Sequence, residues 1–449
     1  MPHRLSVFPA RTGLDIVWLQ ILVLDTVTGG HMYRARLQAI FDKLTFDKPF
    51  RVVLPNGQTG THGQPPYAFT VRVKTNGALR DIVTKSSLGF GEAYTRGDID
   101  VDGDLFALVL LSFELQGGPL RGTFWQRLRY ALGFSARSNT IGRAKKNIAA
   151  HYDLANSFYE LWLDTEMQYT CAYFNKPTDT LEAAQRQKME LVCRKLRLQP
   201  GEFVVEAGCG WGGLALHMAR NYGVRVKSFN ISQEQIAFAR DKAKRLGIGT
   251  DQVEYVLDDY RNIPNYVTSC DKFASICMLE HVGRESYAAF HRLVAKVLRK
   301  PGLAMLQFIS RTNPSPISNP WLEQYVFPGY YNPSLGEIVK PLEAEHQQLH
   351  LVDVENMRCH YALTLHHWLD RLERNAEHIR AEWGERVLRT FRLYLSGGLA
   401  DFSSGGGTLV YQMLLSHGFD NAAPLTRHHF YAADTAALRP VKAPTLEPV

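Results

Sequence analysis

The chain has 449 residues, of which 45% are hydrophobic and 11% aromatic, which fits a soluble globular protein of one large or two ordinary domains. Six cysteines occur without a CxxC spacing, so the sequence indicates neither a metal site nor a disulfide framework, and a reducing compartment fits best. A formal net charge of +7 and a pI near 9.0 favour anionic partners. No nucleic-acid-binding motif accompanies this charge, so we expect no nucleic acid partner.

Both ends of the chain are expected to lie outside the folded domains. Residues 14–27 are apolar, but two aspartates interrupt them and no convincing cleavage site follows. A more ordinary sequence begins at Met32, so translation could start there or at Met1, and residues 1–32 are interpreted as a poorly packed extension. The proline-rich residues 432–449 predict a disordered tail.

Residues 33–118 predict a small α+β domain. Residues 51–54, 68–73 and 82–83 are interpreted as strands, separated by NG and GxxGxxP turn signals. Alternating aspartates in 98–104 superficially resemble a calcium loop, but the terminal glutamate of that motif is missing. Turns that cap the following apolar helix are the better interpretation.

A basic connector follows at residues 119–147. It contains seven arginines and lysines interleaved with apolar and aromatic side chains. Such a run is usually a solvated face, whereas the aromatic interleaving is typical of a segment that lies on an anionic membrane surface. Both interpretations stay open.

The most informative stretch, residues 202–220, reads EFVVEAGCGWGGLALHMAR and predicts a strand, a glycine turn and a helix. Glycines let a ligand approach the backbone, and the first N–H groups of the helix point toward it, so a nucleotide site is indicated. The GxGxxG pattern also fits a dinucleotide-binding dehydrogenase. Glu206 would repel a pyrophosphate but suits the positive charges of S-adenosylmethionine, so we favour this methyl donor over NAD. Taken alone, Glu206 could also be a helix-dipole partner.

Further motifs surround this stretch. Residues 148–174 contain HYDL, FY, LD and YTCAYF in that order, and later parts of the chain read NISQEQ, DYR, LEHVG, WLEQYVFPGYYNPSL and HYALTL. With these motifs the chain resembles the cyclopropane-fatty-acyl-phospholipid synthase family, which includes the mycolic acid methyltransferases. LGFGEAYTRGDIDVDGDL, in residues 33–118, resembles the N-terminal domain of the phospholipid-using members, which implies that residues 33–118 are a lipid-recognition domain. The resemblance therefore covers most of the chain.

A catalytic domain is expected at residues 148–431. Strands predicted at 203–205, 224–229, 253–257 and 272–278 indicate a doubly wound, Rossmann-like α/β methyltransferase domain with helical insertions, next to the small N-terminal α+β domain. Ligands collect at the carboxyl edge of such a sheet. The residues expected to bind S-adenosylmethionine are Tyr169, Thr170, Glu206, Gly208, Gly210, Gly212, Asn230, Gln235, Asp259 and Tyr260.

Some of these residues suggest a specific contact. Asn230 and Gln235 can offer amide hydrogen bonds to the ribose. Asp259 and Tyr260 could form a wall for the adenine. The other interpretation of the acids that follow these strands is helix capping.

Methyl transfer to an isolated double bond needs no activated nucleophile. The enzyme must align the sulfonium methyl with the π bond, protect the carbocation from water and remove a proton. The resemblance implies that a bound bicarbonate accepts this proton, held by a cysteine, a glutamate, a histidine, an isoleucine backbone and a tyrosine. The matching positions are Cys171, Glu280, Ile309 and Tyr361, while Gln307 stands in place of the histidine. The Gln307 amide can donate a hydrogen bond but cannot carry a proton.

Aromatic faces stabilise cations without reacting with them. The candidates for this role are Tyr169, Tyr173, Phe174, Trp321, Tyr325, Phe327, Tyr330, Tyr331 and Tyr361, some of which must belong to the core. Cys171 taken alone would more often be a small buried hydrophobic residue than a ligand. Its occurrence with Glu280 and Glu206 at motif spacing favours the functional interpretation.

The C-terminal part of this domain is expected to contain a loop and a long helix. The proline-rich residues 314–320 predict a loop, which could be a mobile cover over an acyl channel. Helical periodicity extends over residues 361–395, and Gly397, Gly398 and the glycines at 405–407 are expected to end it.

The sequence therefore predicts an enzyme that transfers a methylene group from S-adenosylmethionine to a cis double bond of an unsaturated phospholipid acyl chain, forming a cyclopropane fatty acid. One alternative is a methyltransferase that makes a methyl- or methylene-branched lipid without ring closure. Another is a non-catalytic lipid-binding relative. We expect a cytoplasmic protein, peripheral on the anionic inner membrane face, and leave a homodimer open.

Overall fold

The computed structural model describes residues 41–117 and 155–431, apart from short gaps at 42–43, 45, 86, 315–318, 345–347, 405 and 422. The predictions for residues 1–32, 119–147 and 432–449 lie outside the described part. Contacts divide the chain into two compact units. Of the described residues, unit 1 takes those up to residue 117, those within 316–326 and those within 372–406, and unit 2 takes the others.

Unit 1 is built on a four-stranded sheet with the order β2-β1-β3-β4. β1 is parallel to β3, whereas β2 and β4 run antiparallel to their neighbours. Phe50 and Phe69, paired across β1 and β3, stack at a centroid distance of 5.2 Å and are fully buried. The elements are β1 Phe50–Val53, β2 Thr59–His62, β3 Phe69–Val73, α3 Asn76–Lys85, α4 Ser87–Arg96, β4 Ile99–Gly103 and α5 Leu105–Gly117.

Two local predictions in unit 1 are wrong. Residues 82–83, expected as a strand, lie inside α3, because Leu79 and Ile82 are both buried at the spacing of one helix face. The aspartate-rich stretch, expected as turns, contains β4, which pairs with β3. Of its aspartates, Asp104 does cap the next helix, because its Oδ1 accepts a hydrogen bond from Ala107 N at 3.0 Å.

Later segments of the chain complete unit 1 with α13 Pro320–Tyr325, α16 Ala376–Trp383 and α17 Glu385–Ser404. Since α17 packs on α4 and α5, the contact-based units differ from a single catalytic segment at residues 148–431. Gly397 and Gly398, expected to end a helix, lie inside α17. Leu395 and Leu399 stay buried at helical spacing across them, so packing outweighs the roughly 1 kcal/mol that each glycine costs.

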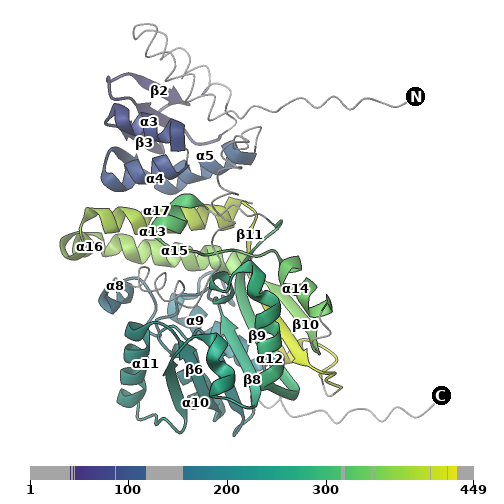
Figure 1. Ribbon diagram of the computed structural model, residues 1–449. Helices are drawn as coiled ribbons and strands as arrows, with labels where there is room; N and C mark the ends of the chain where they lie inside the picture. Colours follow the sequence, from purple (N-terminus) through teal and green to yellow (C-terminus); the bar gives the residue numbers. More distant parts are fainter. Residues whose placement is uncertain are drawn as a thin grey trace, which may run out of the picture. The chain divides into compact units, whose positions relative to one another are not determined.

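Unit 2 contains a seven-stranded sheet with the order β10-β11-β9-β8-β5-β6-β7 (Figure 1). β5 to β9 are parallel, and β11 and β10 are added antiparallel beyond β9. Helices connect the parallel strands, which confirms the predicted Rossmann-like class. The strands are β5 Phe203–Ala207, β6 Arg225–Asn230, β7 Val253–Leu257, β8 Cys270–Ile276, β9 Leu298–Arg311, β10 Leu349–Asn356 and β11 Thr408–His417.

Three helices of unit 2 have a clear cap residue at one end. Thr180 caps α9 and Ser232 caps α11, because each hydroxyl accepts a hydrogen bond from a backbone N–H of the first turn. Gly223 ends α10 with a φ of 63°. The helices wholly or mostly in unit 2 are α8 Asn156–Glu160, α9 Leu181–Lys195, α10 Gly213–Tyr222, α11 Gln233–Arg245, η1 Tyr260–Asn265, η2 Leu279–His281, η3 Arg284–Ser286, α12 Tyr287–Val297, α14 Leu335–Ala344, α15 Arg358–Arg374 and α18 His428–Tyr431.

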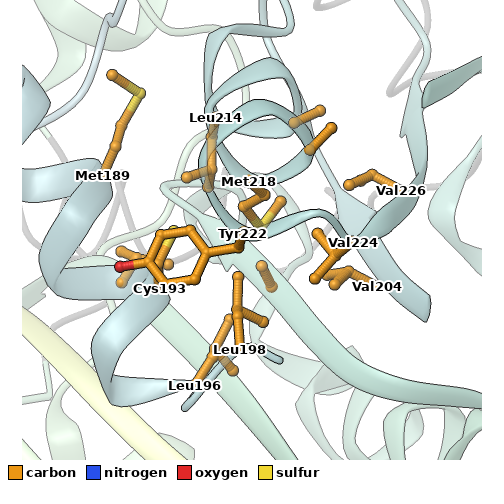
Figure 2. Packing of buried hydrophobic residues seen from close by; sticks show 14 of the residues in the cluster. Met189, Cys193, Leu196, Leu198, Val204, Leu214, Met218, Tyr222, Val224 and Val226 are labelled. Carbon is orange, nitrogen blue, oxygen red and sulfur yellow. The ribbon is translucent and has the colours of Figure 1, made fainter. Parts of the chain in front are cut away.

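A buried apolar cluster holds α9 and α10 against the parallel strands. Figure 2 shows Cys193 of α9, Leu196 directly after α9, Met218 of α10, and Val204 and Val226 of the sheet packed together. All five are at most 2% exposed. This packing fixes the start of α10 at the carboxyl end of β5, where the glycine turn lies.

We predict that Leu216→Ala, in this cluster on α10, lowers the free energy of unfolding by about 2–5 kcal/mol, because it leaves a cavity in a site that is 2% exposed. Chemical denaturation of the purified protein measures the change. Leu246→Ala is the matched control, since Leu246 is 44% exposed and its truncation should cost only about 0.5 kcal/mol. Equal losses in both variants would contradict the role of the cluster.

Candidate active site

A pocket lies at the carboxyl edge of β5, β6, β7 and β8. Nine of the ten residues expected to bind the methyl donor line it, and Gly212 does not. Gly212 instead closes the turn, since its φ is +82° and its carbonyl accepts a hydrogen bond from Tyr255 Oη at 2.8 Å. The lining residues are Met167, Gln168, Tyr169, Thr170, Glu206, Gly208, Cys209, Gly210, Trp211, Leu214, Phe229, Asn230, Ile231, Gln235, Asp258, Asp259, Tyr260, Arg261, Ile276, Cys277, Met278, His281 and Val282.

Glu206 is a buried carboxyl group at the end of β5. It is 2% exposed, and Ser228 Oγ donates a hydrogen bond to its Oε2 at 2.6 Å. Burial raises the pKa of Glu206 to about 7, against the opposing effects of Ser228 and Lys188. A cationic ligand in the pocket would stabilise the ionised form and lower this pKa again. Glu206 is therefore suited to a ligand that brings positive charge.

Asn230, the last residue of β6, and Gln235 line the pocket and also hold the glycine turn. Asn230 Nδ2 donates to Gln235 Oε1 at 2.8 Å and to the Gly210 carbonyl at 3.2 Å. Asn230 Oδ1 accepts a hydrogen bond from Ser232 N. Asn230 thus ties the glycine turn to the start of α11. The sequence suggested only a direct contact between Asn230 and the ligand.

Asp259 is similarly committed to its own neighbour. Its carboxylate is 2% exposed and receives Arg261 Nε at 2.7 Å and Arg261 Nη2 at 2.9 Å. The same guanidinium lies 5.3 Å from the Tyr260 ring centroid. Asp259 therefore fixes the wall of the pocket, and it also accepts Arg261 N at the start of η1, which is the capping role that the sequence left open.

Next to this pocket lies the predicted proton-transfer group. Glu280 Oε1 accepts a hydrogen bond from Ile309 N at 2.6 Å, which brings two predicted residues together. Glu280 Oε2 is buried and has no hydrogen-bond partner among the described residues. Burial raises the pKa of Glu280 to about 7. The carboxyl group therefore carries an oxygen that is ready to bind a further polar group.

Cys171 and Tyr361 are linked through Met357, whose carbonyl contacts Cys171 Sγ and accepts a hydrogen bond from Tyr361 N. Cys171 Sγ contacts the carbonyls of Ala172 at 3.3 Å and Met357 at 3.8 Å. Burial raises the pKa of Cys171 well above its usual value, so the side chain is a neutral thiol. Tyr361, on α15, packs edge-on against Trp368 at 6.0 Å.

Gln307 meets Cys171 and a residue that the sequence analysis missed. Its Nε2 lies 3.5 Å from the Cys171 carbonyl and 3.6 Å from Cys277 Sγ. Cys277 follows β8 with a φ of 57° and lines the donor pocket. A single cysteine has little meaning in a sequence. Its position just before the LEHVG motif is the one signal that could have identified Cys277 as a site residue.

Lys188 and Gln185 of α9 are two more residues that the sequence analysis missed. Lys188 Nζ donates to Gln168 Oε1 at 2.6 Å and to Thr170 Oγ1 at 2.9 Å. Gln185 Nε2 donates to the carbonyls of Gln168 and Thr170. These bonds hold the wall of the pocket in place. A buried lysine inside an amphipathic helix could have been suspected from its position on the apolar face.

An aromatic cluster stands beside these groups. Tyr169 packs against Trp368 at 5.3 Å, Trp162 at 5.2 Å and Phe327 at 6.5 Å. Of the other predicted candidates, Tyr330 and Tyr361 join this cluster through Phe327 and Trp368. Tyr173 and Phe174 stack on histidines, Tyr331 binds Glu337, and Trp321 and Tyr325 belong to unit 1.

The chain matches known sequences over most of its length. Residues 140–413 match the family described as mycolic acid cyclopropane synthetase, and residues 37–122 match a domain of unknown function. The chain is 35% identical over 363 residues to the "probable fatty acid methyltransferase" of Pseudomonas putida, covering 80% of this chain and 89% of that one. It is 33% identical over 360 residues to the cyclopropane-fatty-acyl-phospholipid synthase of Escherichia coli K12, covering 80% and 90%.

Solved structures resemble the chain as well. The cyclopropane synthase MmaA2 of Mycobacterium tuberculosis superposes with a TM-score of 0.56 at 26% identity, over 61% of this chain and 98% of that one. The mycolic acid cyclopropane synthase CmaA1, solved with SAH and CTAB, gives a TM-score of 0.56 at 28% identity over the same shares. At these identities the likeness extends beyond a shared fold.

We predict that Gly210→Val abolishes measurable binding of S-adenosylmethionine. A side chain at Gly210 would enter open space in the pocket, where the donor must lie, and its φ of +53° also disfavours valine. Calorimetry measures the affinity. Gly201→Val is the matched control, because Gly201 also has a positive φ of +82° and open space around it but lies outside the pocket. Unchanged affinity in Gly210→Val would reject the assignment.

Proposed function

The chain belongs to the mycolic acid cyclopropane synthetase family of S-adenosylmethionine-dependent lipid methyltransferases, and from this premise we propose that it cyclopropanates unsaturated phospholipids. The substrate would be a cis double bond in an acyl chain. The observation that carries this proposal is Glu280, a buried carboxyl group that accepts a hydrogen bond from Ile309 N and has its other oxygen unpaired among the described residues.

The proposed reaction balances without an activated nucleophile. The π electrons of the alkene form a new C–C bond to the donor methyl while the S–C bond breaks, which leaves S-adenosylhomocysteine and a carbocation. A proton then leaves the added methyl group, and its C–H electron pair closes the ring. Tyr169 and Trp368 offer π faces that stabilise the cation. Cys171 stays a neutral thiol, so it does not compete as a strong nucleophile.

Bicarbonate is the base that we propose for this site, and the residues fit it. Glu280 Oε2 lacks a partner among the described residues, and the two contacts of Gln307 Nε2, at 3.5 and 3.6 Å, are long enough to be exchanged for a stronger acceptor. Glu280, Gln307, Ile309, Tyr361 and Cys171 would hold the ion. When bound, bicarbonate supplies an acceptor for the proton. The Gln307 amide contributes a neutral hydrogen bond, which is weaker toward an anion than a charged one.

Formation of a branched chain without a ring is the second candidate. The observation that favours it is Gln307, since an amide cannot take up a proton where the family has a histidine. The 35% identity to a protein named as a probable fatty acid methyltransferase supports the same candidate. A non-catalytic lipid-binding protein would bind the donor without turnover.

The product distinguishes these candidates. We predict that the purified enzyme, given S-adenosylmethionine and a cis-monounsaturated phospholipid, makes a ring product and needs bicarbonate. Gln307→His should lower the half-saturating bicarbonate concentration roughly five- to tenfold, the gain expected from a charged donor. Mass spectrometry and proton NMR of the added carbon separate ring from branch.

Glu280→Gln serves as the control for this experiment. It keeps the size of the side chain and should retain donor binding while ring formation is lost. A ring product whose rate ignores bicarbonate in both wild type and Gln307→His would contradict the bicarbonate site. Donor binding without methyl transfer would contradict the enzymatic function.

A lipid substrate places the enzyme at a membrane, and we propose that it is cytoplasmic and binds the anionic inner face peripherally. In the described part of the chain, no helix is both long and apolar enough to cross a bilayer. The basic residues 119–147, which lie outside the described part, motivate the proposal through their composition.

We predict stronger binding to anionic than to neutral vesicles, which salt should weaken because surface charges are screened within about 10 Å at 0.1 M. Sedimentation of the protein with vesicles measures the bound fraction for each lipid composition and salt concentration. Removing Arg127 and Arg129 together should weaken vesicle binding and leave donor affinity unchanged. Equal partitioning onto both vesicle types would argue against this mode of association.

A further inference from the structure

A line of polar side chains crosses the sheet of unit 2 and ends at Gln307. Glu355 of β10 is paired with Gln412 of β11, and Gln412 is paired with Gln307 of β9. Lys195, the last residue of α9, lies over this line, with its Nζ at 2.5 Å from Glu355 Oε2 and 2.9 Å from Gln412 Oε1. Lys195, Gln412 and Gln307 are all 0% exposed. The catalytic region is therefore joined to the sheet edge by buried hydrogen bonds.

The direction of this line is determined by chemistry. The Lys195 ammonium can only donate, so the end of Gln412 that faces it must be the carbonyl oxygen. Gln412 Nε2 then faces Gln307 and donates to its Oε1 at 2.9 Å. Gln307 consequently turns its own Nε2 to the other side, toward Cys171 and Cys277. Each amide has one orientation that satisfies both of its neighbours.

The opposite orientation of Gln307 would be unfavourable. Its amide nitrogen would face the amide nitrogen of Gln412, and its carbonyl oxygen would face the carbonyl of Cys171. Both contacts are between like partial charges in a site that excludes water, where an unmade hydrogen bond is costly. Burial lowers the pKa of Lys195, and the hydrogen-bonded Glu355 carboxylate opposes this shift and so favours the protonated lysine that donates to Gln412.

We propose that Lys195 and Gln412 are positioning residues that hold the Gln307 amide with its N–H, and not its C=O, toward the reacting groups. The benefit of this orientation rests on the proposed function, because an amide N–H can bind an anion such as bicarbonate and a C=O cannot. The orientation itself follows from the hydrogen bonds alone. Neither residue belongs to a sequence motif that signalled the site.

Gln412→Glu tests the proposal by replacing the amide nitrogen of the side chain with an oxygen. The new carboxylate would remain an acceptor for Lys195 but could no longer donate to Gln307. The Gln307 amide would then donate to this carboxylate and turn its oxygen toward Cys171. Neutron diffraction of deuterated crystals, which distinguishes N–D from O, should show Nε2 facing Cys171 in the wild type and Oε1 facing Cys171 in the variant.

Bicarbonate binding provides the second measurement. Calorimetry with bicarbonate should show roughly ten- to hundredfold weaker binding in Gln412→Glu, the loss expected when an anion exchanges a donor for a carbonyl oxygen. Affinity for S-adenosylmethionine should stay unchanged, because Gln412 does not line the donor pocket. Gln307→His in the Gln412→Glu background should restore binding, since a doubly protonated imidazole donates to the introduced carboxylate and to the site together. A purely structural defect would not be rescued in this way.

The outcomes separate the two proposals. An unchanged Gln307 orientation in Gln412→Glu, or a wild-type amide whose oxygen faces Cys171, overturns the positioning role whatever the enzyme makes. A wild type that shows the expected orientation but binds no bicarbonate overturns the proposed base and leaves the positioning role supported. If Gln412→Glu does not fold, Lys195→Met replaces it, and a Gln307 amide that keeps a single orientation there overturns the role of Lys195.

Discussion

Polar groups buried at the carboxyl edge of the parallel strands impose the constraint on which the site depends. Each must find a partner inside the protein or change its charge, because no water offsets its burial. Glu206 and Glu280 respond with a raised pKa, to about 7 in each case. Cys171 stays a neutral thiol. Glu206 and Glu280 can therefore change their charge near neutral pH, which suits a site that receives a cationic donor.

The sequence was most informative where a motif is local. The strand, turn and helix around Glu206 follow from hydrophobic spacing and glycine placement within residues 202–220, and the structure has them as β5 and α10. The same argument failed at residues 82–83, where two β-branched residues suggested a strand. These residues are helical because Leu79 and Ile82 are buried on one face of α3. It also failed at Gly397 and Gly398, because packing of α17 overrides a local preference against helix.

The sequence could not predict the supporting groups of the site, which meet through strand pairing. Gln307 and Gln412 are 105 positions apart, and they become neighbours only because β11 returns antiparallel beside β9. Lys195 arrives from a helix that precedes both strands. The hydrophobic periodicity of a single segment cannot predict contacts between residues this far apart in the sequence. In the same way, Asn230 and Asp259 line the pocket, but the sequence did not reveal that Gln235 and Arg261 are their hydrogen-bond partners.

The interleaving of the two units has a consequence for how the chain can be made. The sheet of unit 1 lies before residue 117 and its helix α17 extends to residue 404, so the ribosome synthesises the sheet long before this helix. α5 leaves the ribosome long before α17, the helix that packs on it. Such late-closing contacts slow folding, because a long loop must be closed first. A fragment that ends before α17 would therefore lack the helix that packs on α5. The sheet of unit 1 can complete its packing only after most of unit 2 has been synthesised.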